Sequence, residues 1–217
     1  MNSIEEIISK LKSLANSKNV DGMARFGISA KNTLGVSMPQ LRALAKKIGK
    51  NHKLALEVWD SGIHEAKILA SLIDFPGEVT EKQMNKWVAG FDSWDVCDQV
   101  CMNLFSKVNI AHKKTFDWSK NKKEFIKRAG FALMATLAVH DKKSPDKIFE
   151  KYYAVIKRES TDERNYVRKA VNWALRQIGK KNHALRKSAI KASKEILKID
   201  NKTAKWIASD ALRELDS

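Results

Sequence analysis

The chain of 217 residues is long enough to bury a sizeable core, and its 43% hydrophobic and 30% charged residues exclude an intrinsically disordered protein. Only 9 glycines and 3 prolines are present, which are too few turn residues for a β-sandwich or barrel of this size. Lys and Arg total 41 against 25 Asp and Glu, and the formal charge of +16 favours a polyanionic partner, nucleic acid before an anionic membrane.

Hydrophobic residues recur with helical spacing along nearly the whole chain. We expect helices over residues 4–14, 37–48, 54–59, 64–73, from 80 onward, and over 94–105, 125–139, 145–158, 166–179, 185–197 and 203–215. Ser3, Ser37 and Thr80 are placed as N-caps, and Gly62 separates two of these helices. With about a dozen helices and no convincing strand, the chain is predicted to be all-α, in one domain over residues 1–217.

A weak internal repeat links residues 127–133 to residues 168–175. The offset from Ala129 to Ala170 is 41 residues, close to the roughly 40–47 residues of HEAT and armadillo repeats. Small residues on these helices permit close packing of neighbours. The repeat therefore predicts a HEAT-like or armadillo-like α–α superhelical solenoid with a basic concave groove.

The cationic residues follow the order of the repeats. If equivalent helices line one groove, its cations are Lys127, Arg128, Arg168, Lys169, Arg176, Lys180, Lys181, Arg186, Lys187 and Lys191. The alternative for each of them is a solvated helix face. Recurrence at matching repeat positions raises Arg128, Arg168 and Lys169 above that alternative, and each phosphate contact would release counterions, so binding should weaken with salt.

One stretch, residues 91–99, combines an aromatic ring with carboxylates. Ser93 is a plausible N-cap, and Trp94 and Asp98 are four residues apart, so they share one helix face. A carboxylate beside a DNA groove repels phosphates, so Asp98 needs a reason to be there. One explanation is an internal salt bridge with Arg128 or Lys127, and the other is a catalytic role for Asp98. Three further tryptophans, Trp59, Trp87 and Trp206, fall on apolar helix faces and are expected in the core.

Several strings together resemble the DNA alkylation-repair family of HEAT-like repeat proteins, the AlkD-type alkylpurine DNA glycosylases. They are residues 23–26, 34–36, 93–98, 127–129 and 169–176, and the resemblance covers almost the whole chain. It implies a solenoid that grips duplex DNA and excises positively charged N3- and N7-alkylpurines without flipping the base. It further implies that Asp98 is the catalytic residue, that Trp94 and Trp173 are groove tryptophans, and that Arg128 contacts the DNA backbone.

The remaining site residues follow from the same resemblance. Phe26 and Tyr166 are the further aromatic residues expected at the lesion, and the cations expected on the DNA backbone are Arg128, Lys127, Arg168, Lys169 and Arg176. Ser93 and Asn165 stand where catalytic relatives can carry aromatic residues, Phe26 replaces a tyrosine, and residues 27–34 indicate a polar loop where active members have a helix.

Two functions stay open on the sequence: a glycosylase, and a DNA-binding protein of the same family that does not excise bases. A protein-interaction scaffold is the third and weakest alternative. An oxocarbenium-like sugar needs a fixed carboxylate rather than a metal, so no metal or other cofactor is expected. The expected partner is double-stranded DNA, with no membrane and no nucleotide cofactor. Neither a signal peptide nor a membrane span is indicated, so we expect a cytoplasmic protein that is nucleoid-associated when bound to DNA. A monomer is the default expectation.

Overall fold

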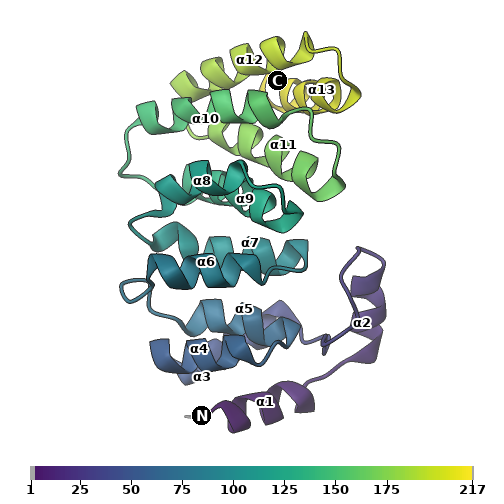
Figure 1. Cartoon of the computed structure of the whole chain (residues 1–217), viewed down its shortest axis with the longest axis vertical. Coiled ribbons are helices and arrows are strands. Elements are labelled where there is room, and N and C mark those ends of the chain that lie inside the picture. Colours follow the sequence, from purple (N-terminus) through teal and green to yellow (C-terminus); the bar gives the residue numbers. More distant parts are fainter. Residues whose placement is uncertain (1–2, 217) are drawn as a thin grey trace. The chain divides into compact units, whose positions relative to one another are not determined.

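A computed structural model of the chain describes residues 3–216. Over that range it contains 13 α-helices, one short 3-10 helix and no strand, which confirms the all-α prediction. The helices, labelled in Figure 1, divide into two compact units, Met1–Val108 and Asn109–Ser217. No helix among the described residues combines the length and the apolar character needed to cross a bilayer. The prediction of one domain over residues 1–217 stays a prediction.

Unit 1 is built around one buried helix. Its elements are α1 (Ile4–Ser13), α2 (Ser17–Ala24), α3 (Met38–Ile48), α4 (His52–Asp60), α5 (His64–Ile73), α6 (Glu81–Ala89), α7 (Trp94–Asn103) and η1 (Phe105–Lys107). Helices α1, α3, α4 and α7 all pack against α5. Nine of the ten residues of α5 are consequently buried, so this helix has no solvated face.

Two stacked tryptophans join α4 to α6. The rings of Trp59 and Trp87 lie 4.2 Å apart between centroids and are nearly parallel, at 3°. Both side chains are buried, as the sequence predicts. An offset or stacked aromatic pair contributes about 0.5–1.5 kcal/mol beyond the area that it buries. The pair therefore fixes the approach of these two helices.

The helix boundaries follow from the capping residues that the sequence supplies. Ser3 Oγ accepts the N–H of Glu6, and Thr80 Oγ1 accepts the N–H of Gln83 at 3.1 Å. Gly62, with φ of +70°, makes the turn between α4 and α5 that a residue with a Cβ rarely adopts. Ser37 forms a capping box with α3, again as predicted.

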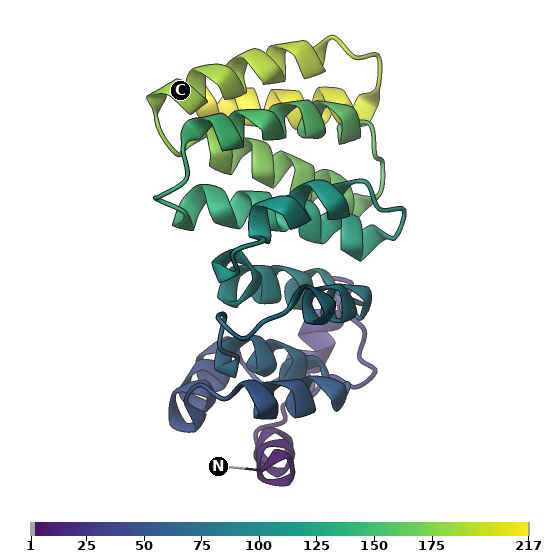
Figure 2. The same cartoon turned by 60° about the vertical axis from the view of Figure 1, so that its left-hand side comes forward.

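Unit 2 consists of three stacked helix pairs. They are α8 (Ala111–Ser119) with α9 (Glu124–His140), α10 (Asp146–Glu159) with α11 (Asn165–Gly179), and α12 (His183–Leu197) with α13 (Lys202–Leu215). Helices α8, α10 and α12 pack side by side in one layer, here called layer A. Helices α9, α11 and α13 form the second, layer B (Figure 2). This pairing is the helix-pair repeat that the 41-residue offset predicts.

Small residues let the paired helices approach closely. A Cβ on Gly130 of α9 would lie 2.6 Å from the backbone nitrogen of Ser119 in α8, so glycine is needed at this contact. Ala129 and Ala170, the two matched residues of the repeat, are fully buried on α9 and α11. The repeat detected in the sequence therefore corresponds to neighbouring helices of layer B.

The structure corrects three predictions. Helices α2 and α8 were not predicted, because α2 has no buried residue and α8 carries many polar ones. Ser93 does begin α7, but its side chain accepts no cap hydrogen bond. Trp206 is not a core residue: it is 40% exposed, and the guanidinium of Arg168 lies over its ring at 5.3 Å.

A fourth correction concerns the order of the basic residues. Arg186, Lys187 and Lys191 were expected in the same row as the cations of α9 and α11. They lie on α12, which belongs to layer A and packs against α10, so they do not continue a row on layer B. Alternating helices of a repeat protein fall in different layers, and an unbroken row of charges along the sequence does not reveal this.

Candidate nucleic-acid interface

Helix α7 carries the tryptophan and the carboxylate on which the predicted chemistry depends. Val96, Cys97 and Val100 are fully buried and hold α7 against α5. Trp94 and Asp98 lie one turn apart and are both half-buried. The core-facing residues thus fix the helix, while Trp94 and Asp98 remain partly accessible beside each other.

The segment that follows α2 covers Trp94. The indole Nε1 of Trp94 donates a hydrogen bond to the main-chain oxygen of Phe26 at 3.1 Å. The side chain of Phe26 itself is 71% exposed, although it is large and apolar. The phenyl ring of Phe26 is therefore accessible to a binding partner.

A buried carboxylate anchors this segment, residues 25–37, which we call the strap. Glu65 is 1% exposed and accepts hydrogen bonds from the main-chain N–H groups of Leu34, Gly35 and Val36, at 2.9, 2.6 and 3.3 Å. Gly35 has φ of +76°, and a Cβ there would meet the main-chain oxygen of Asn16 at 2.2 Å. The strap therefore has a fixed end at Glu65 and a second attachment at Trp94.

A cavity of about 480 Å³ lies within unit 1 between α2, the strap and helices α3, α5 and α7. This volume falls in the range of small-ligand sites, about 300–1,000 Å³. Its apolar wall includes Met23, Phe26, Ile28, Leu41, Ile68 and Trp94, and its polar groups include His64, Glu65, Asp95 and Gln99. Asp95, rather than Asp98, is the carboxylate of α7 that lines it.

His64 and Asp95 form a half-buried ion pair at the wall of the cavity, with 2.7 Å between Nε2 and Oδ2. Burial opposes the charged imidazolium, but the hydrogen bond and charge of Asp95, helped by Glu65 and Asp92, raise the pKa of His64. Burial likewise opposes the charged carboxylate, yet the hydrogen bond to His64 lowers the pKa of Asp95. Each group therefore stabilises the charged form of the other.

In unit 2, an arginine joins α9 to the start of α11. Arg128 is only 6% exposed, and its Nη1 donates a hydrogen bond to the main-chain oxygen of Tyr166 at 2.6 Å. The ring of Tyr166 packs against Phe125, with 5.4 Å between centroids. Arg128 is therefore a fixed guanidinium, held by layer B rather than extended into solvent.

Helix α11 presents an aromatic and cationic stripe. Tyr166, Lys169 and Trp173 follow one another at spacings of three and four residues, so they lie on one face of the helix. The two aromatic side chains are half-buried, and Lys169 is exposed. Aromatic faces interleaved with a cation are suited to the sugars and phosphates of a nucleic acid.

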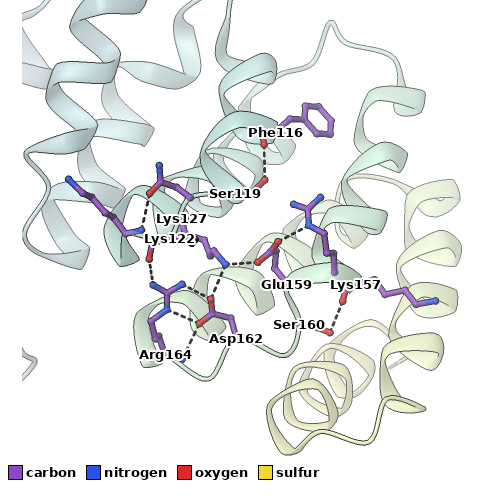
Figure 3. A network of polar contacts seen from close by, with 12 residues as sticks. Phe116, Ser119, Lys122, Lys127, Lys157, Glu159, Ser160, Asp162 and Arg164 are labelled. Carbon is purple, nitrogen blue, oxygen red and sulfur yellow. Dashed lines mark hydrogen bonds and ion pairs between the residues drawn. The ribbon is translucent and has the colours of Figure 1, made fainter.

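The other predicted backbone contacts are engaged within the protein. Figure 3 shows Lys127 between Glu159 and Asp162, with its ammonium at 2.5 and 3.0 Å from their carboxylates. Arg176 forms ion pairs with Asp210 and Glu214. Together with Arg168 over Trp206, these cations join neighbouring helices, which the sequence did not reveal. Their roles as phosphate ligands stay predictions.

The comparisons with known proteins cover almost the whole chain. An uncharacterized protein of Listeria innocua serovar 6a is 23% identical over 203 residues, which is 92% of this chain and 88% of the relative. A solved structure from a new family of proteins related to the HEAT-like repeat DNA glycosylases, with affinity for branched DNA structures, matches with a TM-score of 0.82. That match has 22% identity and covers 99% of this chain and 94% of the other.

At that level of identity the structural match shows the fold alone, and it confirms the predicted all-α HEAT-like repeat fold. The family model is more direct, because it matches residues 7–215, nearly all of the sequence that forms α1 to α13. The chain belongs to the DNA alkylation repair enzyme family.

Proposed function

We propose that the protein binds duplex DNA and excises positively charged N3- and N7-alkylpurines, with Asp98 as the catalytic carboxylate. The observation that carries this proposal is the placement of Asp98 one turn after Trp94 on a helix fixed by its buried face. The matching family describes DNA alkylation repair, which supplies the substrate class. Rigid placement of a charged group on a helix is what electrostatic catalysis requires.

The chemistry needs few groups because the substrate is already activated. A purine alkylated at N3 or N7 carries a positive charge, and cleavage of its bond to C1′ releases it as a neutral base. The electron pair of that bond goes to the base, and positive charge develops on the sugar. The carboxylate of Asp98 stabilises this charge and accepts a proton from the water that attacks C1′. The indole of Trp94 offers its negative face to the same charge.

Unit 2 supplies the binding part of the proposal. We assign Tyr166 and Trp173 to contacts with the nucleotides around the lesion, and Lys169 to a phosphate, because these three share one face of α11. We also assign Arg128 to the backbone; its guanidinium is buried against the main-chain oxygen of Tyr166, so this contact requires DNA to reach the start of α11. Phe26, exposed on the strap, is the second aromatic residue of unit 1, after Trp94, that we assign to the DNA.

The experiment is release of 7-methylguanine and 3-methyladenine from methylated duplex DNA. The Asp98→Asn variant should lose at least about 100-fold in rate, because it removes the charge and retains the shape. Asp117→Asn is the matched control, since Asp117 is an exposed carboxylate of α8 in unit 2. Equal release by wild type and Asp98→Asn, or no release by wild type, would show that the catalytic assignment is wrong.

A second function, DNA binding without excision, is favoured by one specific observation. The polar N–H of Trp94 is bonded to Phe26, and the strap closes over the face of α7 on which the excision proposal depends. The related structure with affinity for branched DNA gives this alternative a substrate class. It predicts salt-sensitive binding to duplex or branched DNA with no base release, and the assay above separates it from the first function.

A further inference from the structure

Layer A of unit 2 carries a second basic surface, on the helices that the proposed DNA contacts do not use. On α10, Lys147, Lys151 and Arg158 are exposed at spacings of four and seven residues. On α12 the residues Lys187, Lys191, Lys194 and Lys198 are exposed at spacings of four, three and four. These spacings place each set along one face of its helix.

The two sets are in register. Lys147, Lys151 and Arg158 match Lys187, Lys191 and Lys198 at a constant offset of 40 residues. Helices α10 and α12 pack side by side (Figure 2), and the axes of packed helices lie about 8–10 Å apart, so the two sets form neighbouring rows. Each row extends over 12 residues, from Lys147 to Arg158 and from Lys187 to Lys198, or about 16 Å. We call the six lysines Lys147, Lys151, Lys187, Lys191, Lys194 and Lys198 the layer-A lysine surface.

The lysines of this surface differ from four of the cations of layer B in one respect. On layer B, Lys127, Arg176, Lys180 and Arg213 all form ion pairs with carboxylates of the protein. Across residues 3–216, none of the six ammonium groups of the layer-A lysine surface takes part in such an ion pair. Their charge is therefore available to an external anion.

Few carboxylates lie near these rows. Glu195 is paired with Lys157 at 2.9 Å, and that hydrogen bond, with the charges of Lys157, Lys191 and Lys198, lowers the pKa of Glu195. Asp146 and Glu150 lie on α10, Asp146 accepts hydrogen bonds from Asn182, and Glu159 is paired with Arg158. The cations of the two rows outnumber these carboxylates, and six lysines without an ion pair among the described residues repel one another in one patch.

We propose that the layer-A lysine surface binds a second segment of duplex DNA. The inference rests on the proposed function, in which the stripe of α11 on layer B holds the first segment. In unit 2 the stripe of α11 and the two lysine rows belong to helices of different layers, so the proposal assigns them to two different duplex segments. A junction offers two arms at once, and lysines bind their phosphates as point charges without reading sequence.

The test compares a linear duplex with a four-way junction built from the same arms. Binding is measured by fluorescence anisotropy over a range of salt for wild type and for the triple variant Lys187→Gln, Lys191→Gln and Lys194→Gln. A control variant, Lys10→Gln, Lys12→Gln and Lys82→Gln, removes the same charge from exposed positions in unit 1.

We expect the layer-A variant to bind the junction at least about tenfold more weakly and to change binding of the linear duplex less than about threefold. Loss of three phosphate contacts should reduce the slope of log K against log salt by about 2.7 for the junction. The control variant should weaken binding of the two DNAs equally, and by less than the layer-A variant weakens binding of the junction. All six substitutions are exposed lysines, and thermal melting checks that each variant is folded.

Three outcomes would overturn the inference. First, the layer-A variant and the control variant could weaken binding of the junction equally. Second, the layer-A variant could weaken binding of the linear duplex as much as binding of the junction. Third, the layer-A variant could lose binding to phosphatidylserine vesicles while its binding of the junction is unchanged. Failure of the proposed function gives a different result. In that case the wild type does not bind the linear duplex, or the double variant Lys169→Gln, Trp173→Ala of layer B binds the linear duplex as tightly as the wild type.

Discussion

The anchor of the strap makes a strong prediction about a single carboxylate. Glu65 is 1% exposed and accepts three main-chain N–H groups, at distances from 2.6 to 3.3 Å. In Glu65→Gln the side chain keeps its length, but an NH₂ replaces one acceptor oxygen and faces donors. Hydrogen bonds to a charged group contribute about 1.5–3 kcal/mol each, so the loss of one to two of them costs about 3 kcal/mol.

The magnitude can be checked in two independent ways. For a chain of this size, about 3 kcal/mol lowers the Tm by roughly 6–12 °C. If the strap opens before the rest of the unit, hydrogen exchange at the amides of residues 34–36 should accelerate more than elsewhere. The control is Glu57→Gln, an exposed glutamate of α4. An unchanged Tm together with unchanged amide protection would refute the anchoring role of Glu65.

Three further changes test the packing and electrostatics of both units. Gly130→Ala should lower the free energy of unfolding by about 2 kcal/mol, because the new Cβ would meet the backbone of α8. Gly22→Ala is the control and should not destabilise the protein, because there is open space around Gly22. Thermal melting of the two variants compares them. Lys127→Met should lower the free energy of unfolding in urea by about 2–3 kcal/mol, because Glu159 and Asp162 lose their shared cation. A variant that loses affinity for DNA but keeps its stability would contradict this structural role of Lys127. His64→Gln should lower the free energy of unfolding more at pH 5.5 than at pH 8.5. The raised pKa of His64 stabilises the folded state below about pH 6.5, and the lowered pKa of Asp95 stabilises it above about pH 3.8. The ion pair therefore contributes fully between these two pH values. Equal urea midpoint shifts at the two pH values would exclude the pair as the cause.

The helices that bury an apolar stripe could be predicted from the sequence. The matched alanines Ala129 and Ala170 identified α9 and α11 as equivalent, and both are fully buried where the two helices meet. Helix α2 was missed because it buries no residue, so it has no apolar stripe to detect. Its position comes from the strap and its tertiary contacts rather than from its own periodicity.

The tryptophans show why burial is harder to predict than helicity. Trp87 and Trp206 both occur on helices with apolar faces, yet Trp87 is fully buried and Trp206 is 40% exposed. The difference lies in the neighbour, because Trp59 stacks on the ring of Trp87, whereas the guanidinium of Arg168 lies over the ring of Trp206 and leaves it partly exposed. A single sequence does not contain the packing partner of a side chain, so this distinction required the structure.

The candidate site was predicted in part for the same reason. The spacing of Trp94 and Asp98 sets their common face, and the structure places them so on α7. The role of Glu65 depends on three N–H groups that lie about 30 residues earlier in the chain, and no local pattern reveals that contact. A glutamate within a mostly apolar helix such as α5 was the available signal, since a buried charge requires a compensating partner.

The contact between Trp94 and Phe26 bears on both proposed functions, and its strength decides how much it matters. A neutral hydrogen bond contributes about 0.5–1.5 kcal/mol net, so breaking it reduces affinity for DNA by only about 2- to 13-fold. The anchor at Glu65 is several times stronger, so the strap would release Trp94 while its other end stays attached. DNA binding at α7 thus needs a local movement around Phe26 and no unfolding of unit 1. Substitution of Glu65 should therefore alter the stability of the strap more than it alters access to Trp94, and the two contacts have separable roles.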